Sequence, residues 1–180
     1  MKKVPKKELS KLARQIKLLI LDVDGVLTDG GIILDSKDNE LKIFHVRDGH
    51  GIRMLLKAGV RVALVTGRHS EVVKRRAEEL GLTDVYQNCR DKLIAYSDLA
   101  TKYSLAGGEI AYVGDDVIDI PLLRQCGLAV AVADADEEVK AVVSLITKAG
   151  GGRGAVREVC DLLLKAKDLW KSMMDEYLKA

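Results

Sequence analysis

The stretch from residue 18 to residue 30, LLILDVDGVLTDG, constrains the fold of this chain more than any other. Its leading apolar residues are typical of a strand buried in the centre of a parallel sheet. The run then breaks into two carboxylates, Asp22 and Asp24, which are costly to bury unless something stabilises their charge. Ligands of open α/β sheets bind beyond the carboxyl ends of the strands, so this placement suits a divalent cation and a phosphate. If this stretch is taken alone, the alternative to a binding site is an ordinary acidic turn after a strand.

Apolar runs and helical patterns alternate along the rest of the chain. We expect strands at 62–65, 85–86, 110–113, 128–132 and 145–146, and helices at 6–15, 48–58, 70–80, 91–103, 117–125, 136–142 and about 155–177. Two β-rich runs around a polar turn predict a β-hairpin insert at about 30–46. The predicted fold is α/β, a single domain over residues 1–180 with a Rossmann-like parallel sheet, helices on both faces and no large cap domain.

Composition excludes several classes of function. A net charge of +2 and an aromatic content of 4% argue against a nucleic-acid partner. No apolar run approaches the length of a membrane span, so we expect no membrane partner. The three scattered cysteines show no metal-ligand spacing and indicate reduced thiols in a cytoplasmic protein.

Polar residues follow several of the predicted strands, and in a parallel sheet these ends share one edge. Thr66 follows the second strand, Asp115, Asp116 and Asp119 follow the strand at 110–113, and Lys92 begins a helix. Each has a simpler alternative, since Thr66 could cap a helix, Lys92 could be solvated, and the aspartates could face a helix dipole. Their joint placement with Asp22 and Asp24 instead predicts a site for a phosphate and a cation.

These motifs resemble those of the haloacid dehalogenase-like phosphatases over residues 17–147: DVDGVLTD at 22–29, Thr66-Gly67-Arg68, Lys92 and GDDVID at 114–119. More narrowly, FHVRDGHGIR at 44–53 and GGRGAVREV at 151–159 resemble the group that acts on 3-deoxy-D-manno-octulosonate 8-phosphate. A carboxylate can attack phosphorus and form an aspartyl-phosphate, and we assign this role to Asp22. Asp24 is the predicted acid and base, while Thr66 and Lys92 bind the phosphoryl oxygens.

The resemblance implies a Mg²⁺ cofactor and a set of substrate contacts. The implied ligands are the Asp22 carboxylate, the Asp24 backbone carbonyl and Asp115, with Asp116 and Asp119 orienting the metal or Lys92. Arginines bind carboxylates well, so extra arginines suit a sugar-acid phosphate. Besides Asp24 and Lys92, the predicted substrate-binding residues are His45, Val46, Arg47, Asp48, Gly49, Arg53, Arg68, Arg76 and Arg153. Solvated surface positions remain the alternative for Arg53 and Arg76, and the sequence does not decide the roles of His45, His50 and His69.

The resemblance therefore implies a phosphatase that releases the free eight-carbon sugar acid for lipopolysaccharide synthesis. The alternatives are a phosphatase for a nine-carbon sialic-type acid 9-phosphate, a receiver-like signalling module that holds its phosphate, and a non-catalytic scaffold. A two-stranded ribbon cannot bury both of its faces, so the apolar residues of the hairpin predict a homo-oligomer, a tetramer as in that family. We also expect the glycine-rich loop at 150–154 to be flexible enough to lie over a site. The alternative is that the hairpin packs on its own domain and that the loop only leads into a helix.

Overall fold

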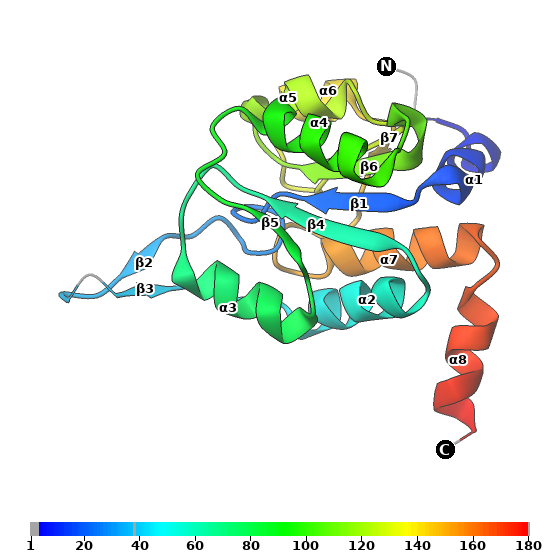
Figure 1. The fold of residues 1–180 in the computed structure, drawn as a ribbon, viewed down its shortest axis with the longest axis horizontal. Helices are drawn as coiled ribbons and strands as arrows, with labels where there is room; N and C mark the ends of the chain where they lie inside the picture. Colours follow the sequence, from blue (N-terminus) through cyan, green and yellow to red (C-terminus); the bar gives the residue numbers. More distant parts are fainter. Residues whose placement is uncertain (1–3, 38, 180) are drawn as a thin grey trace.

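A computed structural model describes residues 4–37 and 39–179. Its main sheet has six parallel strands in the order β5-β4-β1-β6-β7-β8, with β1 between β4 and β6 (Figure 1). In this sheet Leu21 pairs with Leu64 on one side and Val113 on the other. The strands are β1 (Leu18–Leu21), β4 (Arg61–Val65), β5 (Asp84–Tyr86), β6 (Ile110–Gly114), β7 (Leu128–Ala131) and β8 (Leu145–Ile146).

Helices cover both faces of the sheet, which confirms the predicted α/β class. One face carries α2 (Val46–Lys57), α3 (Glu71–Leu80) and α7 (Ala155–Ala166), and the other carries α4 (Lys92–Tyr103), α5 (Ile120–Leu123) and α6 (Glu137–Val142) (Figure 1). Helix α1 (Lys6–Gln15) packs beside α7. Every residue of β1 is buried, as expected for a central strand.

Local sequence signals set the ends of these helices. Ser70 caps α3 by accepting a hydrogen bond from Val73 N at 3.3 Å, and Gly81 ends it in the left-handed region with φ of 78°. Asp91 caps α4 through Leu93 N at 3.0 Å. These caps fix the point at which Lys92 enters the helix directly after the β5 loop.

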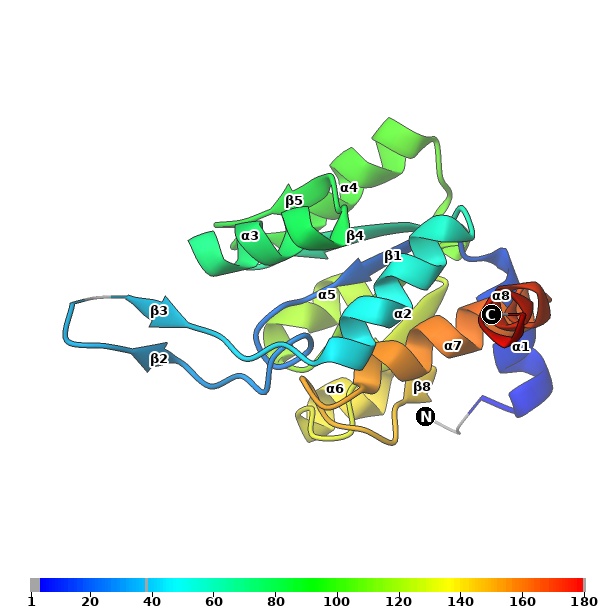
Figure 2. The same ribbon diagram turned by 90° about the horizontal axis from the view of Figure 1, so that it is seen from below.

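The predicted hairpin is present, but its strands are shorter than expected. Only β2 (Ile33–Leu34) and β3 (Glu40–Leu41) pair, and the ribbon projects away from the sheet on the side where β1 ends (Figures 1 and 2). Asp35 closes the turn by accepting hydrogen bonds from Lys37 N and Asn39 N at 2.8 and 2.9 Å. The following helix begins at Val46 rather than at residue 48.

Two predicted helices are wrong in length. The expected helix at 117–125 is a 3₁₀ turn, η2 (Val117–Asp119), followed by the single-turn α5, because the Asp119 carboxylate turns back to the backbone N–H groups of Asp115 and Asp116. The final helix predicted at 155–177 is two helices, α7 and α8 (Trp170–Leu178).

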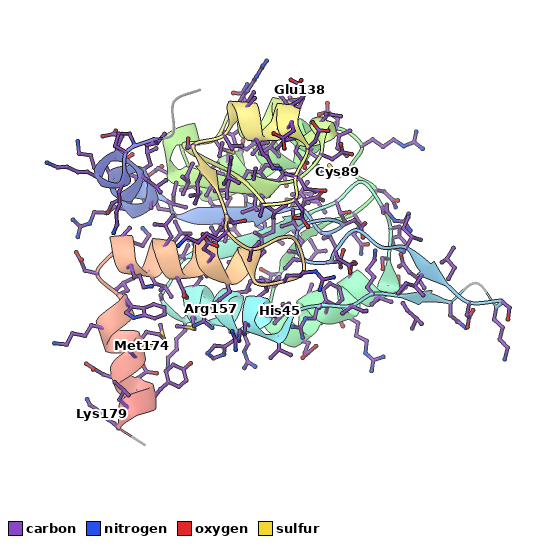
Figure 3. All side chains as sticks on the ribbon, turned by 180° about the vertical axis from the view of Figure 1, so that it is seen from behind. His45, Cys89, Glu138, Arg157, Met174 and Lys179 are labelled. Atoms are coloured by element: carbon purple, nitrogen blue, oxygen red, sulfur yellow. The ribbon has the colours of Figure 1, made fainter. Side chains whose placement is uncertain are left out.

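The break between α7 and α8 is a left-handed C-cap. Asp168 has φ of 60°, and Leu169 N donates to Leu164 O at 2.9 Å, the hydrogen bond that closes a Schellman motif. Helix α8 then leaves the domain at an angle to α7, with Met174 within it and Lys179 directly after its end (Figures 1 and 3). Within the described residues, no helix combines the length and the apolar character needed to cross a membrane.

Candidate active site

A cavity of about 160 Å³ opens where β1, β4 and β6 end. Its lining brings together the residues that the strand-end argument predicts, from loops far apart in the sequence. They are Asp22, Asp24, Thr66, Arg68, Lys92, Asp115 and Asp116. Gly67 and Ile118, which were not predicted as site residues, also line the cavity, whereas the predicted Asp119 does not. The predicted convergence of carboxylates, a hydroxyl and an ammonium at one sheet edge is confirmed.

Lys92 is the buried cation at the base of this cavity. Its Nζ lies 3.0 Å from Asp22 Oδ2 and 2.6 Å from Asp119 Oδ1. It also donates to the hydroxyl of Tyr112, at 3.0 Å, a contact that sequence reasoning missed because Tyr112 stands within an otherwise ordinary buried strand. Burial opposes the charge, but Asp22 and Asp119 outweigh it and raise the pKa of Lys92. Lys92 therefore stays charged beside Asp22.

Asp119 is fully buried, and its oxygens are occupied within the protein. Its Oδ2 accepts hydrogen bonds from Asp115 N at 2.9 Å and Asp116 N at 3.3 Å, while Oδ1 faces Lys92. Asp116 is itself turned to Val117 N at 2.7 Å. These contacts suit Asp119 to orienting Lys92 and the loop after β6, the role that the resemblance implies.

The donor set of the cavity fits a divalent cation. Carboxylate oxygens of Asp22, Asp115 and Asp119 lie within 4.8 Å of one another. The oxygens of Asp119 are engaged by Lys92 and the backbone, so Asp22 and Asp115 are the two of these carboxylates that line the cavity. Asp115 Oδ1 is buried and has no hydrogen-bond partner among the described residues, which is costly unless an ion binds there. Carboxylate oxygens are hard ligands of the kind that Mg²⁺ prefers, so this pair suits the ion.

In the protein without metal, the pKa values of Asp22 and Asp115 are both raised, which favours their protonated forms. Burial, opposed by Lys92 and reinforced by Asp119, raises the pKa of Asp22 to about 7. Burial and then the charges of Asp22 and Asp119 raise the pKa of Asp115 to about 8. A cation at this position would favour the charged forms of both groups.

Thr66 and Asp24 complete the cavity wall. Thr66 does not cap α3, because Ser70 has that role. The Thr66 hydroxyl accepts a hydrogen bond from Arg68 N at 3.3 Å, and Thr66 lines the cavity. The Asp24 carboxylate is paired with Lys42, and its Oδ2 lies 3.7 Å from Arg68 Nε. The hydroxyl and the carboxylate therefore line the same cavity as the Asp22 and Lys92 pair.

Two hairpin residues that the sequence argument did not select reach the site. Lys42 contacts Asp24, and Glu40 accepts from Arg68 Nη2 at 3.1 Å and from Ser70 Oγ. Partial burial alone would raise the pKa of Glu40, but hydrogen bonds from Ser70, Lys42 and Arg68 outweigh it and lower that pKa. Side chains alternate between the two faces of a strand, so residues 40, 42 and 44 share the face of the ribbon that is turned to the domain. This alternation in the sequence could have identified Glu40 and Lys42.

Comparison with known proteins decides the family. The model of the haloacid dehalogenase-like hydrolases matches residues 82–156. The 3-deoxy-D-manno-octulosonate 8-phosphate phosphatase of Escherichia coli K12 is 52% identical over 155 residues, which cover 86% of this chain and 82% of that protein. This chain belongs to the haloacid dehalogenase-like hydrolases.

Solved structures of these hydrolases share the whole fold. The Moraxella catarrhalis 3-deoxy-D-manno-octulosonate 8-phosphate phosphatase, crystallised with a magnesium ion, a phosphate ion and a KDO molecule, has a TM-score of 0.94 and 40% identity, covering 96% of this chain and 99% of that one. The Yersinia pestis phosphatase of the same name has a TM-score of 0.90 and 46% identity, covering 91% and 89% of the two chains.

Most of the other predicted substrate residues of this haloacid dehalogenase-like hydrolase lie outside the cavity. Arg68 lines it, but Arg53 faces a groove against α8, and Arg153 lies 3.5 Å from Asp29 on the surface. Arg76 packs over the ring of Phe44 at 5.7 Å and against Gly49. Val46 and Arg47 are exposed at the start of α2.

Asp48 joins the start of α2 to the glycine-rich loop and the start of α7. The buried carboxylate of Asp48 accepts from Arg157 N at 2.7 Å and Gly154 N at 3.2 Å at the start of α7, on the side where Figure 3 shows His45 and Arg157. His45 Nδ1 lies 3.8 Å from the same carboxylate. The glycine-rich loop, expected to be flexible enough to lie over a site, approaches the turn after β1 so closely that a Cβ on Gly151 would lie 1.8 Å from Gly25 O. The loop is packed against the turn after β1.

Proposed function

We propose that this hydrolase is a Mg²⁺-dependent phosphatase that converts 3-deoxy-D-manno-octulosonate 8-phosphate to the free sugar acid and phosphate, in lipopolysaccharide biosynthesis. The observation that carries the proposal is the Asp22 carboxylate 3.0 Å from the buried Lys92, at the end of the central strand. The relatives named for this reaction are about half identical to this chain over most of its length, which supports the same substrate.

The residues suit a two-step phosphoryl transfer. An Asp22 oxygen forms a bond to phosphorus as the bond to the sugar oxygen breaks, and Asp24 gives that oxygen a proton. Water then forms a bond to phosphorus as the Asp22 bond breaks, and Asp24 takes the proton of the water. Lys92 and Thr66 hold the phosphoryl oxygens where negative charge gathers. When bound by Asp22, Asp115 and the Asp24 carbonyl, Mg²⁺ offsets further phosphoryl charge.

The size of the cavity indicates how the substrate binds. At about 160 Å³ it is well below the roughly 300–1,000 Å³ typical of sites that enclose a small molecule. It suits a phosphoryl group, with the sugar acid directed past Arg68 toward the hairpin. The carboxylate of the sugar acid then needs a cationic partner beyond the cavity, a role we assign to arginines at the entrance.

The exposed face of the hairpin supports an oligomer. Ile33 pairs with Leu41, so Ile33, Leu41 and Ile43 share one face of the ribbon, where they are 44%, 58% and 66% exposed, while Glu40 and Lys42 on the other face contact the domain. An apolar ribbon face of this kind is typical of an interface. We propose a closed homo-oligomer, a tetramer, in which neighbouring hairpins cover one another and bring His45, Val46, Arg47 and other entrance residues to an adjacent site.

The other candidate functions have less support. The nine-carbon acid would use the same cavity, but the named relatives favour the eight-carbon acid. A receiver would hold its phosphate on Asp22, whereas Asp24 in the cavity supplies the acid and base for turnover. Free Cys89, Cys126 and Cys160 agree with a reducing compartment, and we place the reaction in the cytoplasm.

A panel of phosphate esters tests the substrate. We expect phosphate release with Mg²⁺ to be fastest from 3-deoxy-D-manno-octulosonate 8-phosphate, slower from a nine-carbon keto acid 9-phosphate and slowest from neutral hexose 6-phosphates. Arg68→Ala should lower kcat/KM for the sugar acid more than for p-nitrophenyl phosphate. Equal rates across the panel would contradict the assignment.

A further inference from the structure

We propose that Lys42 of the β2–β3 hairpin is a positioning residue that fixes the Asp24 carboxylate for proton transfer. The inference rests on the proposed function, in which Asp24 is the acid and the base. It makes the hairpin part of the chemistry of its own subunit, in addition to its exposed apolar face.

Lys42 is enclosed in a way that surface lysines are not. Its side chain is 1% exposed, and Nζ contacts Asp24 Oδ1. A lysine is almost never fully buried unless it is paired. The carboxylate it pairs with is 21% exposed and lines the catalytic cavity. The ion pair therefore joins a buried side chain of the hairpin to a partly exposed side chain of the cavity.

Glu40 holds the other side of the lysine. Its Oε1 lies 3.3 Å from Lys42 Nζ and 3.1 Å from Arg68 Nη2. Its second oxygen accepts from Ser70 Oγ at the start of α3. Glu40 thus ties the ribbon to the loop between β4 and α3, which also carries Thr66. Lys42 cannot move without breaking contacts on both sides.

The direction of these contacts leaves one oxygen of Asp24 for the reaction. Lys42 contacts Oδ1, whereas Arg68 Nε lies 3.7 Å from Oδ2, beyond hydrogen-bond distance. Proton transfer needs a heavy-atom separation of about 2.6–3.2 Å, and a misplacement of about 1 Å can cost on the order of 100-fold in rate. Loss of Lys42 would release Asp24 from this geometry.

The two chemical steps respond differently to a displaced Asp24, and this gives the test. Nitrophenolate is a good leaving group and needs little protonation, so p-nitrophenyl phosphate can phosphorylate Asp22 without help. Removal of the phosphoryl group still needs Asp24 to take a proton from water. In Lys42→Met, rapid mixing with p-nitrophenyl phosphate and Mg²⁺ should give a burst of about one nitrophenolate per site.

The steady rate after that burst should be at least about 10-fold below that of the unaltered protein. KM should not rise, because the substrate contacts remain. Lys42→Arg should recover part of the rate by restoring the charge. Lys37→Met is the matched control, since Lys37 lies in the exposed turn of the same ribbon, and it should match the unaltered protein.

A Lys42→Met rate within twofold of the unaltered protein would overturn the proposal. A loss without a burst, together with a lower melting temperature, would also overturn it in favour of a structural role. If Lys42→Met does not fold, Lys42→Gln is measured in the same way, and the same outcomes decide. A wild type that hydrolyses p-nitrophenyl phosphate but not the sugar acid rejects the substrate while leaving this test valid, and one that hydrolyses neither rejects both.

Discussion

A Cβ atom on Gly25 would lie 2.0 Å from Oδ2 of Asp115. Gly25 also has φ of 89°, a conformation that glycine adopts without steric cost. The turn after β1 and the end of β6 therefore approach so closely that only a residue without a side chain leaves room for the Asp115 carboxylate. Gly25 thus shapes the proposed metal site as well as the turn that carries Asp24.

This contact predicts a metal defect in Gly25→Ala. The new methyl group should displace Asp115, and the Mg²⁺ concentration for half-maximal activity should rise by about 10–100-fold. Gly59→Ala is the matched control, because Gly59 has φ of 79° but no atom within 4 Å of its ideal Cβ. The control should lose about 1–2 kcal/mol of stability and keep its Mg²⁺ dependence. An unchanged Mg²⁺ dependence in Gly25→Ala would remove this role.

The raised pKa values of Asp22 and Asp115 predict how Mg²⁺ binding stabilises the fold. Without metal, both carboxyls hold protons in the folded state up to about pH 7 and pH 8, whereas the unfolded chain loses them near pH 4. Their contribution to stability is therefore complete below pH 4 and declines as pH rises through 7 to 8. Mg²⁺ must displace these protons, so it should raise the melting temperature more at pH 8.5 than at pH 5.5.

Melting curves with Mg²⁺ and with a chelator at the two pH values measure this difference. Asp115→Asn is the control, and it should lose most of the Mg²⁺ stabilisation at pH 8.5. A Mg²⁺ effect of the same size at both pH values would show that these carboxyls are not its ligands.

The exposed face of the hairpin predicts assembly. Ile43→Asp should place a charge in the proposed interface, so sedimentation should shift from tetramer toward smaller species, with lower activity on the sugar-acid phosphate. Ile94→Asp on α4 is the control, because Ile94 and Ile43 are exposed to similar extents, 68% and 66%. A fully active monomer of the unaltered protein at micromolar concentration would contradict the assembly.

The strand-end residues were predictable from sequence for a topological reason. Parallel strands bring their carboxyl ends to one edge, so Asp22, Thr66 and Asp115 needed only correct strands to be placed together. Lys92 followed from its position after the β5 loop. The polar network below the cavity was less accessible, because Tyr112 reads as a core residue until Lys92 and Asp119 are seen around it.

Contacts made by irregular segments were not predictable. The inward face of the ribbon depends on its angle to the domain, so Lys42 and Glu40 were missed although Ile43 and Leu34 were noticed. The glycine-rich loop was expected to be flexible, and its contact with the turn after β1, where Gly152 N donates to Val26 O at 2.9 Å, was not foreseen. The end of α7 depends on Asp168 adopting a left-handed conformation, which favours glycine and gave no signal in a helical pattern.

Phosphate release from 3-deoxy-D-manno-octulosonate 8-phosphate by the unaltered protein and by Asp22→Asn, with Mg²⁺, tests the central claim most directly. Asparagine has the size of aspartate but cannot act as the nucleophile. The unaltered protein should turn over this substrate, and Asp22→Asn should lose activity by on the order of 10³-fold or more while keeping its folded circular-dichroism spectrum. Near-normal phosphate release by folded Asp22→Asn would contradict the account.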